Sequence, residues 1–413
     1  MDKTIIKEYM RKVNPWWNEN FKSLNIEYTE RDIFKEIIKY MSLRMIIALT
    51  GLRRVGKTTL AMKIVEQKIL DSFDKKQILY FSFDDFSEIR IMELIDIYEE
   101  IFGKVDRGKK YLIVFDEIQK IKDWSNQLKV VYDIYPNIKF IISGSESLFI
   151  RKKSKESLAG RIFEFKVNPL TFKEFLRFRK IKIDNIFIQR DEILKNFNQF
   201  LITNGFPEII NYNENDARKY ITEGIIEKTI YSDFVQVFEV KRTDIIRSIF
   251  NIIYNEPGQI IDIQDLSKEL GISRGILSNY LEYLEEAFLI KKLYNYSRNA
   301  RKTQRRLKKF FSTLTNHFLM EHNFGKIFEQ FITLQLNAEY FWRDSFKNEV
   351  DVILLDPLRA IEIKSGEIKE RDLTSLEKFI KKFKPEEVKV LSYNIEKVIG
   401  GVQIIPFYKY LLK

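Results

Sequence analysis

Apolar residues in the first part of the chain alternate between short continuous runs and longer amphipathic stretches. After an amphipathic N-terminal stretch, which predicts a helix, apolar runs at 45–50, 78–83, 111–115 and 138–142 are separated by amphipathic stretches of helical length. Strands that alternate with helices form parallel sheets, and continuous apolar runs indicate strands that are buried on both faces. This part of the chain is therefore predicted to be a parallel α/β unit.

The pattern becomes helical beyond this unit. One more strand, 162–167, ends at Asn168-Pro169, and 171–231 then reads as mostly helical, with a break at 204–207. A helical segment of this size that directly follows an α/β core is predicted to be a lid.

A helix-turn-helix pattern comes next. The run 262–273 precedes an amphipathic helix that begins at Arg274, with Gly271 placed in the turn and Ser273 as the N-cap. The apolar residues 288–290 then fit the first strand of a wing. These features predict a winged helix.

The C-terminal part begins with a helix at 324–336. It continues with a strand pair at 350–355 and 359–363, a helix at 371–382 and a strand at 388–392. This order predicts a second, smaller α/β unit. The chain is accordingly divided into an N-terminal helical segment, an α/β core, a helical lid, a winged helix and a C-terminal α/β domain, with the boundaries 1–35, 36–170, 171–240, 241–298 and 299–413.

Length and composition narrow the classes of protein. A chain of 413 residues with 45% hydrophobic content can bury several cores. Cysteine is absent and the histidines are two, His317 and His322, so any metal ion must bind to oxygen ligands. The N-terminal residues lack the apolar core of a signal peptide, and no uninterrupted apolar stretch of about 18 residues is present. We therefore expect a cytoplasmic protein with no membrane partner.

The charge distribution points to a polyanionic partner. The net charge is +11, and the stretch from Ala287 to Met320 contains no acidic residue. Aromatic residues interleave with its basic ones, as in surfaces that grip phosphates and pack against bases, although the stretch could equally be a solvated face. The basic residues of this stretch are Lys291, Lys292, Arg298, Arg301, Lys302, Arg305, Arg306, Lys308 and Lys309. Nucleic acid, specifically DNA, is the predicted partner.

A phosphate-binding loop is the clearest chemical motif. It lies between an apolar strand and a helix, as its mechanism requires, because backbone N–H groups wrap the phosphates, a lysine reaches the β and γ phosphates, and a hydroxyl binds magnesium. The predicted ATP-binding residues are Gly51, Leu52, Arg53, Arg54, Val55, Gly56, Lys57, Thr58 and Thr59. Lys57 is also predicted to act in catalysis, and Thr58 to bind the ATP-associated Mg²⁺.

A second acidic element supports the same site. The apolar run 111–115 ends at Asp116 and Glu117, which predicts one carboxylate for the magnesium shell and a second one that polarises water. Ser143 ends the next strand, where a hydroxyl would contact the γ-phosphate or the attacking water. The alternative for Ser143 is an ordinary strand-to-loop turn.

The C-terminal strand pair carries a second candidate centre. Glu362 and Lys364 share one face of a strand, and a hairpin centred on Asp356-Pro357 would place Asp351 opposite Glu362. Two carboxylates would then converge on one magnesium ion, with Glu329 of the preceding helix completing the shell. The alternative is an exposed hairpin in which these carboxylates pair with Lys364.

These motifs resemble those of prokaryotic AAA-type ATPases that end in a DUF4143-like region and are common in archaea. The resemblance rests on five segments, 53–59, 116–119, 143–145, 158–161 and 169–175, and it covers nearly the whole chain. It implies an α/β fold, namely a P-loop NTPase core of the AAA+/ASCE type with a helical lid, a winged helix-turn-helix and a restriction-endonuclease-like C-terminal domain. Asp351, Glu362 and Lys364 resemble the PD-(D/E)xK nuclease motif.

The function predicted from these features is a Mg²⁺-dependent ATPase coupled to DNA binding, with metal-dependent nuclease activity in the C-terminal domain. The alternatives are a nucleotide-gated DNA- or protein-binding regulator with an inactive scaffold, or a winged helix that contacts proteins. Arg161 is the candidate arginine finger, acting either within its own chain or on a second copy in a homo-oligomer, or else it is an arginine paired with a core carboxylate. Arg53 and Arg54 would shape the loop or an oligomer contact. The predicted DNA contacts are Arg274, Ser278, Asn279, Arg301, Arg305 and Arg306.

Overall fold

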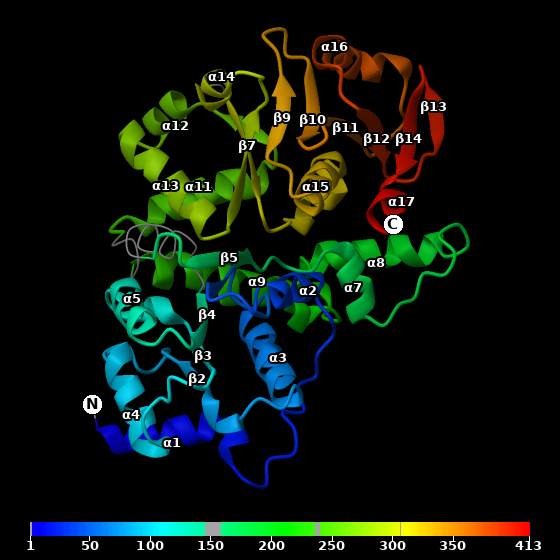
Figure 1. Ribbon diagram of the computed structural model, residues 1–413. Coiled ribbons are helices and arrows are strands. Elements are labelled where there is room, and N and C mark those ends of the chain that lie inside the picture. The colour runs from blue at the N-terminus through cyan, green and yellow to red at the C-terminus, as the bar shows by residue number, and fades with distance from the viewer. Residues whose placement is uncertain (1, 145–157, 236–239, 306) are drawn as a thin grey trace. The chain divides into compact units, whose positions relative to one another are not determined.

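The computed structural model describes residues 2–144, 158–235, 240–305 and 307–413 (Figure 1). The chain forms two compact units, the first ending at Pro169 and the second beginning at Leu170. Each unit is described by itself. Within the described residues, no helix is both long and apolar enough to cross a membrane.

The first unit is built on a five-stranded sheet in which every pairing between neighbouring strands is parallel. Its order is β2-β3-β4-β1-β5, so the first strand along the chain lies inside the sheet, between the fourth and the fifth. This confirms the predicted parallel α/β core. The strands are β1 (Ile46–Thr50), β2 (Ile78–Ser82), β3 (Tyr111–Asp116), β4 (Ile138–Gly144) and β5 (Ile162–Lys166).

Helices connect these strands and bury apolar faces against them. Leu79, Phe81, Phe115 and Phe140 contribute to a core that is fully shielded from solvent. Burial on both faces explains why β1 and β3 read as continuous apolar runs. The connecting helices are α3 (Lys57–Leu70), α4 (Ile91–Phe102) and α5 (Trp124–Ile134), and α2 (Asp32–Lys39) precedes β1.

The N-terminal segment packs as part of this unit. Its helix α1 (Lys3–Val13) buries Ile6 and Met10 in the same core. After α1, the Asn14 side chain donates to the Tyr80 carbonyl oxygen at 2.9 Å and accepts from the Tyr80 N–H at 2.7 Å. Tyr80 belongs to β2, an edge strand of the sheet. The segment therefore satisfies backbone groups that a sheet edge would otherwise leave open.

A nine-stranded mixed sheet forms the centre of the second unit, in the order β13-β14-β12-β11-β10-β9-β7-β8-β6. The strands of the predicted C-terminal α/β unit belong to this sheet. Its strands are β6 (Gln259–Ile261), β7 (Ile290–Asn295), β8 (Lys308–Ser312), β9 (Tyr340–Arg343), β10 (Glu349–Leu354), β11 (Arg359–Lys364), β12 (Glu387–Ser392), β13 (Lys397–Ile399) and β14 (Val402–Pro406).

The helix-turn-helix forms where the sequence pattern places it. Gly271 has a φ of +63°, which suits glycine in the turn, and the Ser273 hydroxyl accepts from the Ile276 N–H at the start of the next helix. The helices are α11 (Thr243–Asn255), α12 (Ile263–Glu269) and α13 (Arg274–Glu286).

The wing extends further along the chain than the predicted boundary at 298. Strand β7 pairs antiparallel with β8, and α14 (Ala300–Arg305) connects the two. The sequence analysis did not predict β8 because this strand lies in the basic stretch. Two of its residues, Phe310 and Phe311, are nevertheless buried. On its other side β7 pairs parallel with β9, so the wing and the C-terminal strands share one sheet.

The helices predicted as a lid belong to the second unit. The first two of them pack their aromatic side chains against α15 (Met320–Gln335) and α17 (Phe407–Leu411). The ring of Phe197 lies 4.7 Å from the rings of both Phe331 and Phe407, measured between centroids. These helices are α7 (Phe172–Phe178), α8 (Arg190–Thr203) and α9 (Glu214–Ile221), and α16 (Thr374–Phe383) covers β10 and β11.

Candidate functional site

The predicted phosphate loop joins β1 to α3. A Cβ atom on Gly51 would lie 2.1 Å from the Val167 carbonyl oxygen, so the close packing of the loop requires glycine there. Gly56 has a φ of +93° and is the N-cap of α3. The Lys57 ammonium donates to the carbonyl oxygens of Gly51 and Leu52, at 3.0 and 2.9 Å. The lysine is thus folded back over the loop that it is predicted to serve.

Arg31 holds this loop from the N-terminal segment. The side chain is 7% exposed and donates to the Val55 carbonyl oxygen at 3.0 Å and to the Asn168 carbonyl oxygen at 2.8 Å. Arg31 was not predicted as a site residue, because it belongs to no motif and lies far from the phosphate loop in the sequence. Of the two loop arginines, Arg53 is half-buried and Arg54 is exposed.

Asp116 accepts three side-chain hydrogen bonds at the end of β3. Its Oδ2 accepts from the Thr58 hydroxyl at 2.7 Å and from the Tyr80 hydroxyl at 3.0 Å, and its Oδ1 accepts from the Ser143 hydroxyl. Burial, and then the Asp116 carboxylate, raise the pKa of Tyr80, so that this hydroxyl stays protonated as a donor. Tyr80 was not predicted as a site residue, since its apolar strand gives no signal of a polar role.

Glu117 follows directly and has the left-handed backbone conformation, with a φ of +52°. Its N–H lies 3.4 Å from the Ser143 Oγ, and its Oε2 accepts from the Gln119 amide at 2.5 Å. Burial raises the pKa of Glu117; Lys57 opposes this effect and Asp116 adds to it. The structure therefore brings the predicted residues Thr58, Asp116, Glu117 and Ser143 together beside the loop.

Arg161 lies at the other end of the sheet from the phosphate loop of its own chain. Ile46 pairs with Ile162 next to Arg161, whereas the loop follows Thr50 at the opposite end of the same parallel pair. Four residues of strand span about 13 Å. The Arg161 Nε lies 3.3 Å from Asp133 Oδ1. Asp133 is exposed, so this partner is a surface carboxylate and not the core carboxylate of the alternative prediction.

The predicted C-terminal centre comes together on β10 and β11. Because Val352 pairs with Ile361, the antiparallel register brings Asp351 opposite Glu362. The Lys364 ammonium lies 2.8 Å from Glu362 Oε1, and Asp351 Oδ2 accepts from the Ile363 N–H at 2.8 Å. The register of β10 with β9 shifts between Val350 and Ile353, so Asp351 lies at an irregularity of its strand.

Burial dominates the electrostatics of this centre. It raises the pKa of Asp351 well above its ordinary value, and the carboxylates of Glu362 and Glu329 add to the effect. Burial likewise raises the pKa of Glu362, against the opposing influence of Lys364. For Lys364, burial lowers the pKa, but Glu362 and Asp351 outweigh it, so the pKa lies above its ordinary value.

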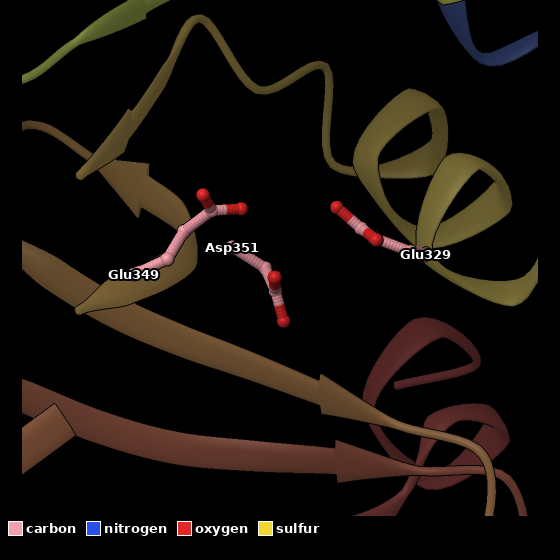
Figure 2. A group of neighbouring side chains, drawn as sticks. All are labelled: Glu329, Glu349 and Asp351. Carbon is pink, nitrogen blue, oxygen red and sulfur yellow. The ribbon is translucent and has the colours of Figure 1, made fainter. Parts of the chain in front are cut away.

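Two residues of this centre were not predicted for it. Figure 2 shows Glu349, from β10, turned with Asp351 toward Glu329 of α15, and one oxygen from each carboxylate lies within 4.8 Å of the others. Lys309 of β8 pairs with all three carboxylates and its side chain is 1% exposed. As a member of the basic stretch, Lys309 was expected at a DNA-binding surface; its burial corrects that expectation.

The predicted DNA contacts are exposed where the structure describes them. Arg274, Ser278 and Asn279 lie on the solvent side of α13, and Arg301 is exposed on α14. The side chains of the other two predicted contacts, Arg305 and Arg306, lie outside the described residues.

Comparisons with known protein families match most of the chain. An AAA domain matches residues 43–176, a domain of unknown function (DUF8612) matches 194–319, and a second one (DUF4143) matches 324–410. An uncharacterized protein of Methanocaldococcus jannaschii is 29% identical over 88% of this chain and 87% of its own length. An uncharacterized protein of Haemophilus influenzae is 25% identical over 72% of this chain and 74% of its own length.

Three solved structures show a partial likeness to this chain. A Walker-type ATPase of Pyrococcus abyssi shares 17% identity, covers 72% of this chain and 97% of its own, and has a TM-score of 0.45. The ORC2 protein of Aeropyrum pernix, with ADPNP and ADP, shares 13% identity over 78% of this chain and 98% of its own, with a TM-score of 0.38. The ORC1 protein of the same organism, in complex with DNA, shares 12% identity over 75% of this chain and 97% of its own, with a TM-score of 0.32.

Proposed function

Because the chain carries an AAA domain and a C-terminal DUF4143 region, we propose that it is a Mg²⁺-dependent ATP hydrolase. One observation carries this proposal: the Thr58 hydroxyl and the Asp116 carboxylate lie 2.7 Å apart beside the phosphate loop. Hydroxyl and carboxylate oxygens are the hard ligands that magnesium prefers. Thr58 and Asp116 would therefore hold the ion, which supplies neutralisation of phosphate charge when it is bound with ATP.

The chain's own groups account for the remaining steps. The loop N–H groups between Gly51 and Thr58 bind phosphate oxygens, and Lys57 exchanges its two carbonyl contacts for the β and γ phosphates. Glu117 polarises the attacking water, with its carboxylate oriented by Gln119. Ser143 and Tyr80 keep Asp116 in place from the flanking strands.

The experiment that tests this proposal separates nucleotide binding from turnover. Lys57→Ala should abolish binding of a fluorescent ATP analogue, whereas Glu117→Gln should bind the analogue but release almost no phosphate. Lys63→Ala is a matched control, because Lys63 pairs with Glu66 on α3, beyond the loop. Phosphate release by Glu117→Gln at the wild-type rate would remove Glu117 from catalysis.

A second candidate function is DNA binding by the winged helix. It is supported by the exposure of Arg274, Ser278 and Asn279 on α13, the helix that follows the turn. In helix-turn-helix proteins that bind DNA, the second helix enters the major groove and its N-terminal residues reach base edges. The alternative partner, a protein, would bind the same exposed face without strong dependence on salt.

The proposal extends to metal-dependent cleavage of DNA at the C-terminal centre. Its support is the convergence of Asp351, Glu362 and Lys364, which offers oxygen ligands and one ammonium group at the same place. The test is Mg²⁺- or Mn²⁺-dependent cleavage of linear and branched DNA by wild type, Asp351→Asn and Lys364→Ala. Cleavage should require both residues. Its absence with every metal and substrate would favour the regulator with an inactive scaffold.

A further inference from the structure

A buried ammonium group lies at the centre of the carboxylates in Figure 2. Lys309 Nζ is 2.6 Å from Glu349 Oε1 and 3.9 Å from Asp351 Oδ1, and it also contacts Glu329 Oε1. Burial lowers the pKa of Lys309, but these carboxylates outweigh it and hold the pKa above its ordinary value. The Lys309 ammonium thus occupies the position between the three carboxylates.

The spacing of the oxygens suits a cation. Two ligands of one Ca²⁺ ion lie at most about 5.2 Å apart, and two ligands of Mg²⁺ at most about 4.2 Å, since these ions bind oxygen at 2.3–2.6 and 2.0–2.1 Å. The oxygens of Glu329, Glu349 and Asp351 lie within 4.8 Å of one another. The cluster as it stands has the dimensions of a Ca²⁺ site, and a smaller ion would need it to contract slightly.

Glu362 gives an independent sign of a missing ligand. The residue is 4% exposed, and among the described residues its Oε2 has no hydrogen-bond partner, while its Oε1 pairs with Lys364. Glu362 lies opposite Asp351 and interacts electrostatically with Glu329 and Lys309. Because leaving a buried carboxylate oxygen without a partner is costly, Glu362 Oε2 favours a cation in its neighbourhood.

Lys309 reaches the cluster from a different part of the sheet. It belongs to β8 of the wing, whereas Glu349 and Asp351 belong to β10, with β7 and β9 between the two strands. The positive charge and its β10 carboxylate partners are therefore carried by strands that are not neighbours in the sheet.

We propose that Lys309 is an exchangeable counter-ion: its ammonium fills the cation position formed by Glu329, Glu349 and Asp351, and a divalent cation binds there when the wing withdraws it. This inference rests on the proposed metal centre and adds its regulation, because the wing that is proposed to bind DNA then controls metal access. The C-terminal centre is closed to metal in the conformation described here.

The test measures Mn²⁺ and Ca²⁺ binding by calorimetry, and thermal unfolding, on the full chain without nucleotide. Lys309→Met keeps the aliphatic stem and removes the charge. It should unfold at a lower temperature than wild type in metal-free buffer, because buried carboxylates lose their counter-ion. Added Mn²⁺ should restore its unfolding temperature and bind at least about tenfold more tightly than to wild type. The phosphate loop is common to all variants, so differences between them report on this cluster.

Two further variants complete the test. Lys308→Met, at the neighbouring position of β8, should behave as wild type toward metal. Lys309→Met combined with Glu329→Gln and Glu349→Gln should recover stability and lose the response to Mn²⁺. Equal Mn²⁺ binding by wild type and Lys309→Met would overturn the inference. So would a Lys309→Met chain that stays unfolded in Mn²⁺ while the triple variant folds. Absence of DNA cleavage would bear on the proposed nuclease activity alone, since these readouts need no cleavage.

Discussion

The Gln119 side-chain amide donates to Glu117 Oε2 at 2.5 Å, within the turn that follows β3. A donor to a carboxylate stabilises its ionised form, so Gln119 opposes the rise that burial causes in the pKa of Glu117. The contact also fixes the direction of the carboxylate. Gln119 is therefore a positioning residue for the proposed base.

The first prediction concerns the pH dependence of ATP hydrolysis. A base must be ionised, so the rate should fall as pH drops through the pKa of Glu117, which lies above its ordinary value. Gln119→Leu removes the donor and raises this pKa further, and the acid limb of the kcat profile should move to higher pH. Gln67→Leu, which alters a glutamine paired with Asp71 on α3, serves as the control. An unshifted profile would leave Gln119 without a role in positioning the base.

The second prediction concerns the hydrogen bond from the Tyr80 hydroxyl to Asp116. Tyr80→Phe keeps the ring and removes the hydroxyl that donates to Asp116 Oδ2. Hydrogen bonds to charged groups contribute about 1.5–3 kcal/mol, so the Mg²⁺ concentration for half-maximal hydrolysis should rise by about tenfold or more. A magnesium titration of ATPase rate measures this effect. Tyr98→Phe, another buried tyrosine of the same unit whose hydroxyl donates to the Lys76 carbonyl oxygen, should leave the titration unchanged.

The third prediction concerns Arg161, which lies at the opposite end of the β1–β5 strand pair from the phosphate loop of its own chain. If it acts as an arginine finger, it acts on a second copy of the chain. ATPase activity per chain should then rise with protein concentration, and a mixture of Arg161→Ala and Lys57→Ala chains should recover activity that neither has alone. Asp133→Asn, which removes the partner of Arg161 within the chain, should have little effect, because exposed ion pairs contribute little. No recovery in the mixture would assign Arg161 a structural role.

The fourth prediction concerns DNA. Binding through phosphates weakens steeply with salt, and each arginine contact that is removed should flatten the slope of log K against log salt by about one unit. Arg274→Ala and Arg301→Ala are the direct tests, and charge reversal at Arg305 and Arg306 extends them along the basic stretch. Arg242→Ala is the control, since that exposed arginine pairs with Asp244 in the first turn of α11. Affinity that is insensitive to salt would assign the winged helix to a protein partner.

Local sequence patterns were sufficient to predict the phosphate loop and the C-terminal hairpin. A phosphate loop needs glycine, lysine and threonine at fixed spacing, and its strand and helix neighbours follow from hydrophobic period. The residues Lys57, Thr58, Asp116 and Glu117 were therefore identified without a structure. Alternation along a hairpin likewise brought Asp351 opposite Glu362, because side chains on paired strands have a fixed period of two.

Tertiary packing decided what the sequence could not. Tyr80, Arg31 and Lys309 act on residues far away in the chain, and no short-range pattern records which distant partner a side chain meets. Lys309 shows the reason most clearly. In the sequence, Lys309 is one of nine basic residues in a stretch without acidic residues, and such a residue is expected to be exposed to solvent. In the fold, three carboxylates from α15 and β10 surround it, and the favourable charge interaction there compensates for its burial.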